Sequence, residues 1–372
     1  MSKIDRKKFL KSLAAGTLAL PFALRALGLG STVKAQSNKG SFNEEIFEWK
    51  MVTTWPPNFP VLGEGCNLFA QIIERLSQGR LKIKVYGGGE LVPALGAFDA
   101  VRSGAAEMGS GVSYYWAGKM PASQFFGSVP FGMNAQQLNA WLISGGGMDL
   151  WRELYGQFGL VPFVGGNTGV QMGGWFNKKI ESLDDIKGLK MRIPGLGGKV
   201  LEKAGGTPVL IAGSELYTSL ERGIIDATEW IGPYHDHKMG FYQIAKYYYS
   251  PGWHETGSAL EFFVNQEAYE KLPEDLQAMI ESVCLQINHW MLSEFEAQNA
   301  IYLKKLVEEE GVELKNFPTS VLDQLRIYTQ ETIEELVESD PFSKKVYESY
   351  SSFQKKIQKW SDISEKKFYS QL

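Results

Sequence analysis

Two polar side chains stand out because each lies in a strand-like, glycine-rich part of the chain. Gln171 lies in the run Val170–Phe176, whose side chains alternate between two faces, and Arg192 lies in Gly188–Pro194, which a proline ends. Glycines beside them let a small molecule approach the main chain. Arginine offers a planar pair of donors that matches a carboxylate. We therefore predict a carboxylate-binding site within residues 164–198.

Two carboxylates, Glu229 and Glu255, fall in comparable places. Glu229 lies in the strand-like run Ile224–Trp230, and Glu255 lies in the turn-rich segment Tyr247–Gly257. Burying a carboxylate without a partner of opposite charge is costly. Polar groups at strand ends and crossings therefore favour a buried site that also holds a cation.

Ordinary structural roles stay open for each of these residues. Gln171 is also typical of a structural hydrogen-bonding residue, and Glu229 of a surface carboxylate. Arg192 has Asp184 and Asp185 nearby in the sequence as alternative ion-pair partners.

Cysteine and histidine supply few alternatives. Cys66 and Cys284 lie in amphipathic runs, which favours buried free thiols, and no zinc or haem spacing is present. His235 and His237 are separated by one residue and could hold a metal, but they closely follow Gly232-Pro233, which favours a solvated helix start. His254, beside Glu255, is the one tempting general base.

Composition and charge place the chain among globular proteins. It has 372 residues, 44% of them hydrophobic and 22% charged, with a net charge of −4. The length predicts about two domains, and the charge gives no indication of nucleic-acid binding.

We predict that residues 1–35 are a signal peptide and not part of the fold. A basic stretch precedes an apolar run broken by Pro21 and Arg25, and small residues before Gln36 suit cleavage. Arg6-Lys7 resembles the twin-arginine export motif with lysine in the second place, so both export routes stay open, as does an uncleaved anchor. No cysteine follows the apolar run, which argues against a lipoprotein.

A first α/β unit follows from the pattern after residue 46. Strand-like runs at 47–54, 81–86 and 106–111 alternate with helical runs at 62–76 and 94–103. This order predicts right-handed crossovers and a mainly parallel sheet, with ligands at the carboxyl ends of its strands. The loops Trp55–Pro60 and Ser113–Trp116, which includes Tyr114, should therefore face a site.

A second unit begins near Val170, and the chain then returns to the first. Strand-like runs at 207–211 and 224–230 flank a helical run at 214–221, and a strand at 260–265 is assigned to the first unit. We expect domain I to comprise 44–169 and 255–300, domain II 170–254 and 301–316, and a helical tail 317–372. Two crossings predict a hinged pair of domains.

Four ordered motifs carry a resemblance to a known family. These are VGGNTGVQMGGWF (164–176), GLKMRI (188–193), GIIDATEWIGPY (223–234) and YYSPGW (248–253). With them, nearly all of the chain after residue 46 resembles the solute-binding subunit of tripartite ATP-independent periplasmic (TRAP) transporters, closest to the members that bind 2-oxo acids. The implied fold class is α/β, a two-domain periplasmic solute-binding fold with crossing segments and a long helical tail.

The resemblance also implies a binding site. Arg192 matches the arginine that pairs with the ligand carboxylate. A cation that bridges protein and substrate would be held by the Gln171 side-chain oxygen, the Glu229 and Glu255 carboxylates and the Trp230 carbonyl; such oxygen donors suit Na⁺ or Ca²⁺. Further hydrogen bonds or walls would come from Asn167, Tyr114 and Trp175.

The implied function is capture without chemistry. The exported protein would bind a small monocarboxylate such as pyruvate in the periplasm and deliver it to the TRAP membrane permease, and it would form a homodimer through the helical tail. Lactate-like 2-hydroxy acids and sugar acids are alternative ligands. A secreted metal-dependent enzyme acting on hydroxy acids, or a sensory partner, is the alternative function.

Overall fold

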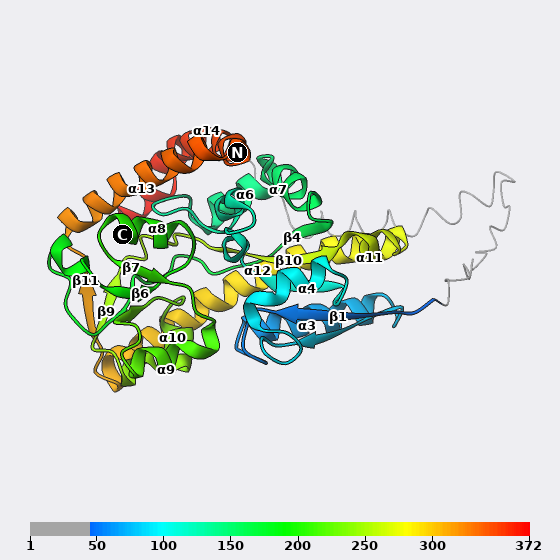
Figure 1. The fold of residues 1–372 in the computed structure, drawn as a ribbon, viewed down its shortest axis with the longest axis horizontal. Coiled ribbons are helices and arrows are strands. Elements are labelled where there is room, and N and C mark those ends of the chain that lie inside the picture. Colours follow the sequence, from blue (N-terminus) through cyan, green and yellow to red (C-terminus); the bar gives the residue numbers. More distant parts are fainter. Residues whose placement is uncertain (1–44) are drawn as a thin grey trace, which may run out of the picture. The chain divides into compact units, whose positions relative to one another are not determined.

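The computed structural model describes residues 45–372, which build two sheets with helices around them (Figure 1). The predicted signal peptide, residues 1–35, lies outside the described residues.

The first sheet has five strands in the order β2-β1-β3-β10-β4. β1 (Phe47–Thr53) pairs in parallel with β2 (Leu81–Tyr86) and β3 (Met108–Gly111). β10 (Ala259–Asn265) lies antiparallel between β3 and β4 (Leu160–Asn167). The returning strand therefore joins the first sheet, as predicted. The three strands predicted for the first unit are parallel to one another, and β10 is the one strand of this sheet that runs against the others, so the sheet is mainly parallel, as predicted.

Amphipathic helices cover this sheet. In α3 (Leu62–Leu76) the buried residues Leu62, Cys66, Phe69 and Ile73 recur every three or four positions, which gives one apolar stripe. The other helices on this side are η1 (Ala94–Gly96), α4 (Ala97–Arg102), η2 (Ser113–Trp116), η3 (Pro121–Ser123), α5 (Gln124–Gly127), α6 (Ala135–Ser144) and α7 (Gly147–Gly156).

The second sheet has six short strands in the order β11-β9-β5-β8-β6-β7. Their bounds are β5 Gly174–Phe176, β6 Lys190–Arg192, β7 Thr207–Val209, β8 Ala227–Thr228, β9 Tyr247–Ser250 and β11 Glu313–Asn316. The helices on this side are η4 (Leu183–Ile186), α8 (Gly195–Lys203), η5 (Gly213–Glu215), α9 (Leu216–Glu221), α10 (Pro233–Met239) and η6 (Phe241–Gln243). β6 pairs in parallel with both β7 and β8, which brings the carboxyl ends of these strands together.

Long helices complete the fold. After α11 (Gln266–Glu270), α12 (Glu274–Lys304) packs on β4 of the first sheet, on α3, and on α10, the helix that follows β8 of the second sheet (Figure 1). It ends in a π turn, Lys305–Glu309. The tail forms α13 (Thr319–Ser339), α14 (Pro341–Ile363) and α15 (Glu365–Tyr369); α13 packs on α8, and α14 packs on α5 to α7. Within residues 45–372, none of the helices combines the length and the apolar character that crossing a bilayer requires.

One predicted strand is largely wrong. Of the run Val170–Phe176 only the last three residues form a strand, because Gly169 and Gly174 adopt positive φ angles of 70° and 115° that bend the chain. Gln171 therefore lies in an irregular segment. The predicted domain boundaries stay a prediction.

Candidate functional site

The site begins where two parallel strands of the second sheet end. Arg192 is the last residue of β6 and pairs with Thr228, the last residue of β8, so Glu229 follows directly beside it. The main-chain N–H of Glu229 donates to the carbonyl of Arg192 over 3.3 Å. Parallel pairing thus places a guanidinium and a carboxylate at one edge of the sheet.

The segments that run between the sheets supply the facing groups. The main-chain N–H of Gln171 donates to the carbonyl of Glu255 over 3.1 Å, which holds the two segments together. The Gln171 side-chain amide donates to the Glu255 carboxylate at 2.6 Å and to the Thr168 hydroxyl at 3.1 Å. Gln171 Oε1 is buried and has no hydrogen-bond partner within residues 45–372. An acceptor oxygen is therefore left free inside the protein.

Arg192 is almost fully buried and makes four contacts. It forms an ion pair with Glu229, donates to the Tyr115 hydroxyl at 3.2 Å and to the Ile211 carbonyl at 3.4 Å, and lies over the Trp230 ring at 5.2 Å. Burial opposes its charge, but Glu229 together with the hydroxyls of Tyr115 and Tyr114 outweighs this and raises the pKa of Arg192 above its ordinary value.

The alternative ion-pair partners of Arg192 are used elsewhere. Asp184 pairs with Lys187 at 2.6 Å, and Asp185 accepts from the main-chain N–H groups of Glu181 and Ser182. That alternative is therefore wrong.

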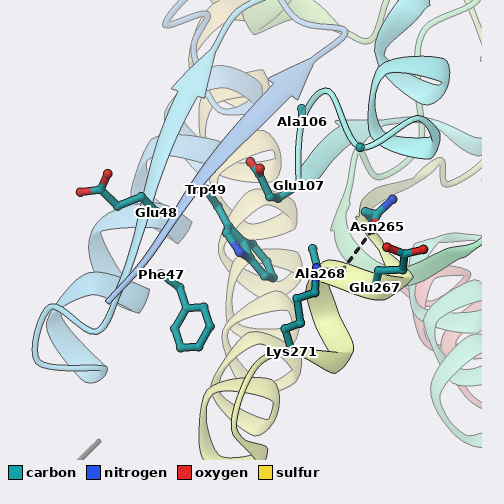
Figure 2. A pocket seen from close by; sticks show the side chains of 10 residues that line it. Phe47, Glu48, Trp49, Ala106, Glu107, Asn265, Glu267, Ala268 and Lys271 are labelled. Carbon is teal, nitrogen blue, oxygen red and sulfur yellow. Dashed lines mark hydrogen bonds between the residues drawn. The ribbon is translucent and has the colours of Figure 1, made fainter. Parts of the chain in front are cut away.

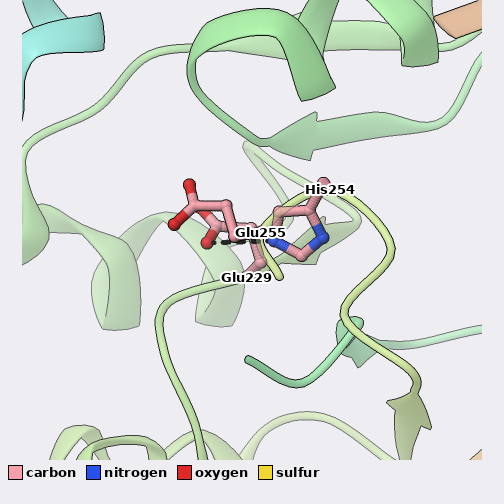
Figure 3. A group of neighbouring side chains, drawn as sticks. All are labelled: Glu229, His254 and Glu255. Atoms are coloured by element: carbon pink, nitrogen blue, oxygen red, sulfur yellow. Dashed lines mark hydrogen bonds and ion pairs between the residues drawn. The ribbon is translucent and has the colours of Figure 1, made fainter. Parts of the chain in front are cut away.

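Glu229, His254 and Glu255 form a compact buried cluster (Figure 3). One potential ligand atom from each lies within 4.8 Å of the others. His254 Nε2 lies 3.4 Å from Glu229 Oε2. Burial, together with the negative charge of Glu229, raises the pKa of Glu255. Two buried carboxylates held this close favour a positive charge between them.

The cavity lined by Gln171 and Arg192, the partners of Glu255 and Glu229, is small. It encloses about 10 Å³, about the room that one water molecule needs. Residues from both sheets line it: Trp55, Val112, Tyr114, Tyr115, Thr168, Gln171, Arg192, Trp230, Ile231 and Leu260. A ligand therefore fits only if Arg192 and Glu229 separate or the two sides of the cavity move apart.

A larger hollow of about 330 Å³ lies elsewhere, beside the start of β1 (Figure 2). Two of its polar side chains are already used by the fold: Glu107 accepts from the main-chain N–H of Lys50 at 2.7 Å, and Asn265 accepts from that of Ala268 at 3.1 Å. No residue of the second sheet lines it. Its size therefore does not make it a better candidate than the smaller charged cavity.

The structure brings most of the predicted residues together. Gln171, Arg192, Tyr114 and Trp230 line the small cavity, and Glu229 and Glu255 lie in the buried cluster. Two others are held differently. The side-chain oxygen of Asn167, at the end of β4, accepts from the main-chain N–H of Gly169 at 2.9 Å, and its buried amide nitrogen has no partner within residues 45–372. The Trp175 indole donates to Asp236 at 3.0 Å and stacks on Tyr248.

Sequence reasoning did not assign six of the residues that line the cavity to the site: the polar or aromatic Tyr115, Thr168 and Trp55, and the apolar Val112, Ile231 and Leu260. Tyr115 contacts Arg192, Thr168 contacts Gln171, and Trp55 begins the loop after β1. Tyr115 and Trp55 lie in the two loops that follow strands of the first sheet at their carboxyl ends, where ligands of parallel sheets bind. That rule could have assigned both residues to the site. Thr168 follows β4, a strand that we did not predict.

The His235–His237 segment does not form a metal site. His235 Nε2 contacts the Pro60 carbonyl, Asp236 accepts from Trp175 and Tyr248, and His237 lies 3.5 Å from Glu310. The helix does start at Pro233, but His235 and Asp236 are buried, so the predicted solvated start is wrong. Cys66 and Cys284 are buried free thiols, as predicted.

Residues 51–340 match the family described as bacterial extracellular solute-binding protein, family 7. The chain belongs to this family. A curated relative, the monocarboxylate 2-oxoacid-binding periplasmic protein all3028 of Nostoc sp. (strain PCC 7120), is 41% identical over 317 residues, which are 85% of this chain and 86% of that protein.

Solved structures of family members share the whole fold. A TRAP periplasmic solute-binding protein of Colwellia psychrerythraea, with bound calcium and pyruvate, is 42% identical with a TM-score of 0.86 over 88% of this chain and 100% of that one. Another from Pseudoalteromonas atlantica T6c, with bound sodium and pyruvate, gives the same identity, TM-score and coverage. The predicted two-domain solute-binding fold and the TRAP family assignment are confirmed.

The donors in this chain fit a hard cation. The free oxygen of Gln171 and the carboxylates of Glu229 and Glu255 are buried together, and oxygen ligands are those that Na⁺ and Ca²⁺ prefer. The fit rests on chemistry that the structure displays: an acceptor without a donor, next to two carboxylates that repel each other.

Proposed function

We propose that this TRAP solute-binding protein captures a small monocarboxylate 2-oxo acid, such as pyruvate, together with Na⁺ or Ca²⁺. The observation that supports this most directly is the buried oxygen of Gln171, which has no partner within residues 45–372 and lies beside Glu255 and near Arg192. A lone acceptor among carboxylates costs free energy unless a cation or a donor reaches it.

Binding requires Arg192 to exchange partners. Its guanidinium turns from Glu229 to the substrate carboxylate, which accepts two parallel hydrogen bonds from it. Glu229, Gln171, Glu255 and the Trp230 carbonyl would then hold the cation. The cation would supply a positive charge that offsets the two carboxylates and attracts the oxygens of the acid. Tyr114, Asn167 and Trp175 support the walls of the site.

We infer binding without turnover. The family and the relatives named above are solute-binding proteins. His254, the one candidate general base, is buried with Nε2 directed at Glu229, so its ring is engaged with a proposed cation ligand. Closure around the ligand would then present a surface that the TRAP membrane permease recognises.

We also propose export and dimerisation. Residues 1–35 would direct the chain to the periplasm, and domains I and II would meet at the cavity. The end of the tail exposes large apolar side chains, with Trp360 61% and Ile363 72% exposed. A second copy covering this surface is the homodimer that we expect.

A thermal-shift panel tests the proposed ligand. Mature protein is screened with 2-oxo acids, 2-hydroxy acids and sugar acids, each with Ca²⁺, with Na⁺ and with chelator. A ligand that binds only the folded state raises Tm. We expect pyruvate to raise it only when an ion is present. Stabilisation by sugar acids alone, without dependence on the ion, would contradict both the ligand class and the cation bridge.

A further inference from the structure

His235 connects the two sides of the small cavity, although it is not one of the residues that line it. It lies on α10, which follows β8 of the second sheet, and its ring is fully buried. Nε2 lies 2.8 Å from the carbonyl of Pro60, in the loop that follows β1 of the first sheet. On its other side, the Trp230 indole N–H donates to Nδ1 over 3.3 Å.

These two bonds fix the state of the ring. A carbonyl only accepts and an indole N–H only donates, so the proton must be on Nε2 and Nδ1 must carry the lone pair. Burial also lowers the pKa of His235 to about 3, which keeps the ring neutral. Both nitrogens are thus satisfied, unlike Nδ1 of His254, which has no partner within residues 45–372.

Aromatic packing surrounds this connection on both sides. The His235 ring lies 4.7 Å from Phe59 and 4.7 Å from Phe295 of α12, both edge to face, and Phe59 also contacts Trp230 at 6.3 Å. Edge-to-face packing of this kind fixes the orientation of a ring.

The loop that carries Pro60 is held in an unfavourable conformation. Val61 has a φ of 58° and Asn58 a φ of 53°, although a β-branched residue rarely adopts positive φ. Such residues persist where surrounding contacts determine the conformation. The bond from His235 to Pro60 is one such contact, next to Val61 in the chain.

Trp230 connects this arrangement to the binding site. Its ring lies under the Arg192 guanidinium at 5.2 Å, and its carbonyl is one of the proposed cation ligands. We propose that His235 is a positioning residue: it fixes Trp230 for cation and carboxylate binding only when the loop Trp55–Pro60 has closed against α10. This inference rests on the proposed function, because it assumes that Trp230 serves the site. The His235 imidazole thereby couples closure of the loop Trp55–Pro60 to retention of the ligand.

Three substitutions at this position separate the two bonds. His235→Phe keeps a ring between Phe59 and Phe295 but removes both nitrogens. The amide nitrogen of His235→Gln reaches the place of Nε2 and can donate to Pro60, whereas the oxygen of His235→Asn takes the place of Nδ1 and accepts from Trp230 only. His237→Phe is the matched control, because His237 lies on the same helix but stacks on Tyr242 and pairs with Glu310.

The measurement is pyruvate dissociation in Ca²⁺ by stopped-flow tryptophan fluorescence, with affinity by calorimetry. Loss of a residue that orients a metal ligand typically weakens metal binding by about 10- to 100-fold. We expect that loss for His235→Phe, through faster dissociation, because it removes both bonds. His235→Asn and His235→Gln each keep one of the two bonds and should lose less, and His237→Phe should show no change. Unchanged affinity in His235→Phe, or a His235→Gln variant no better than His235→Phe, overturns the proposal.

Failure of the proposed function gives a different result. If wild-type protein binds no pyruvate with Ca²⁺ or Na⁺, the ligand assignment falls whatever the variants do. The positioning role is then tested by small-angle X-ray scattering of ligand-free protein. A larger radius of gyration for His235→Phe than for wild type and His237→Phe supports it, and equal radii overturn it.

Discussion

Replacing Arg192 with alanine should remove ligand affinity and also destabilise the protein, and these two losses are separable. The guanidinium is 2% exposed and is the charged partner of Glu229. In the proposed complex it gives two charge-assisted hydrogen bonds to the substrate carboxylate, worth about 1.5–3 kcal/mol each. Their loss, about 3–6 kcal/mol, predicts a Kd for pyruvate raised about 10²- to 10⁴-fold.

The stability loss has a different cause. Without Arg192, Glu229 is left buried beside Glu255, and breaking a buried ion pair on one side costs about 3–5 kcal/mol. The double variant Arg192→Ala/Glu229→Gln removes the unpaired buried charge of Glu229. It should therefore recover much of the free energy of unfolding but none of the affinity for pyruvate.

Calorimetric titration with pyruvate and Ca²⁺, beside urea unfolding, measures both losses. Arg152→Ala is the control, since Arg152 forms an exposed pair with Glu281 at 2.8 Å that should contribute less than about 1 kcal/mol. Pyruvate affinity in Arg192→Ala equal to that of wild type would refute the assigned carboxylate site. If pyruvate affinity returned in the double variant, the loss of affinity would come from the unpaired Glu229 carboxylate and not from the missing guanidinium.

Three further predictions concern the cation, the core and the tail. Gln171→Leu removes the unpaired oxygen and should weaken Ca²⁺-dependent pyruvate binding at least about tenfold by calorimetry; unchanged ion dependence would argue against Gln171 as a ligand. Burial raises the pKa of Glu261 to about 7, above its unfolded value. The stability that it contributes is therefore fully present below about pH 4.5 and lost as pH rises through about 7. Glu261→Gln should flatten that decline in melts from pH 5 to 9, and a parallel decline would contradict the assignment. Trp360→Glu places a charge on the exposed tail surface and should convert the dimer to a monomer in light scattering. A variant that stays dimeric would show that this surface plays no part in association.

Local patterns predicted much of the fold. α3 and β2 have the bounds that periodicity predicted. α3 buries one apolar stripe, and in β2 the exposed residues Lys82 and Lys84 alternate with more buried neighbours. The return of β10 to the first sheet was also predicted, since the strand-like run after the turn-rich segment had to pair somewhere. β11, four residues long and paired only with β9, was not predicted, because so short and polar a run has no distinctive period.

The site was predictable in residue identity but not in geometry. The parallel-sheet rule indicated that Arg192 and Glu229 lie at strand ends, and their pairing follows from the register of β6 with β8. Gln171 was placed in a strand, whereas the glycines before and after it bend the chain so that its main chain pairs with Glu255. The contact of His235 with Pro60 joins residues 175 positions apart, and no local pattern indicates such a contact.

The most direct test of the central claim is a crystal structure of the mature protein with pyruvate and Ca²⁺, with the ion located by its anomalous scattering. We expect Ca²⁺ bound by oxygens of Gln171, Glu229, Trp230 and Glu255, and the pyruvate carboxylate paired with Arg192. Pyruvate bound elsewhere, or an Arg192–Glu229 pair that persists beside the ligand with no anomalous peak, would contradict the account.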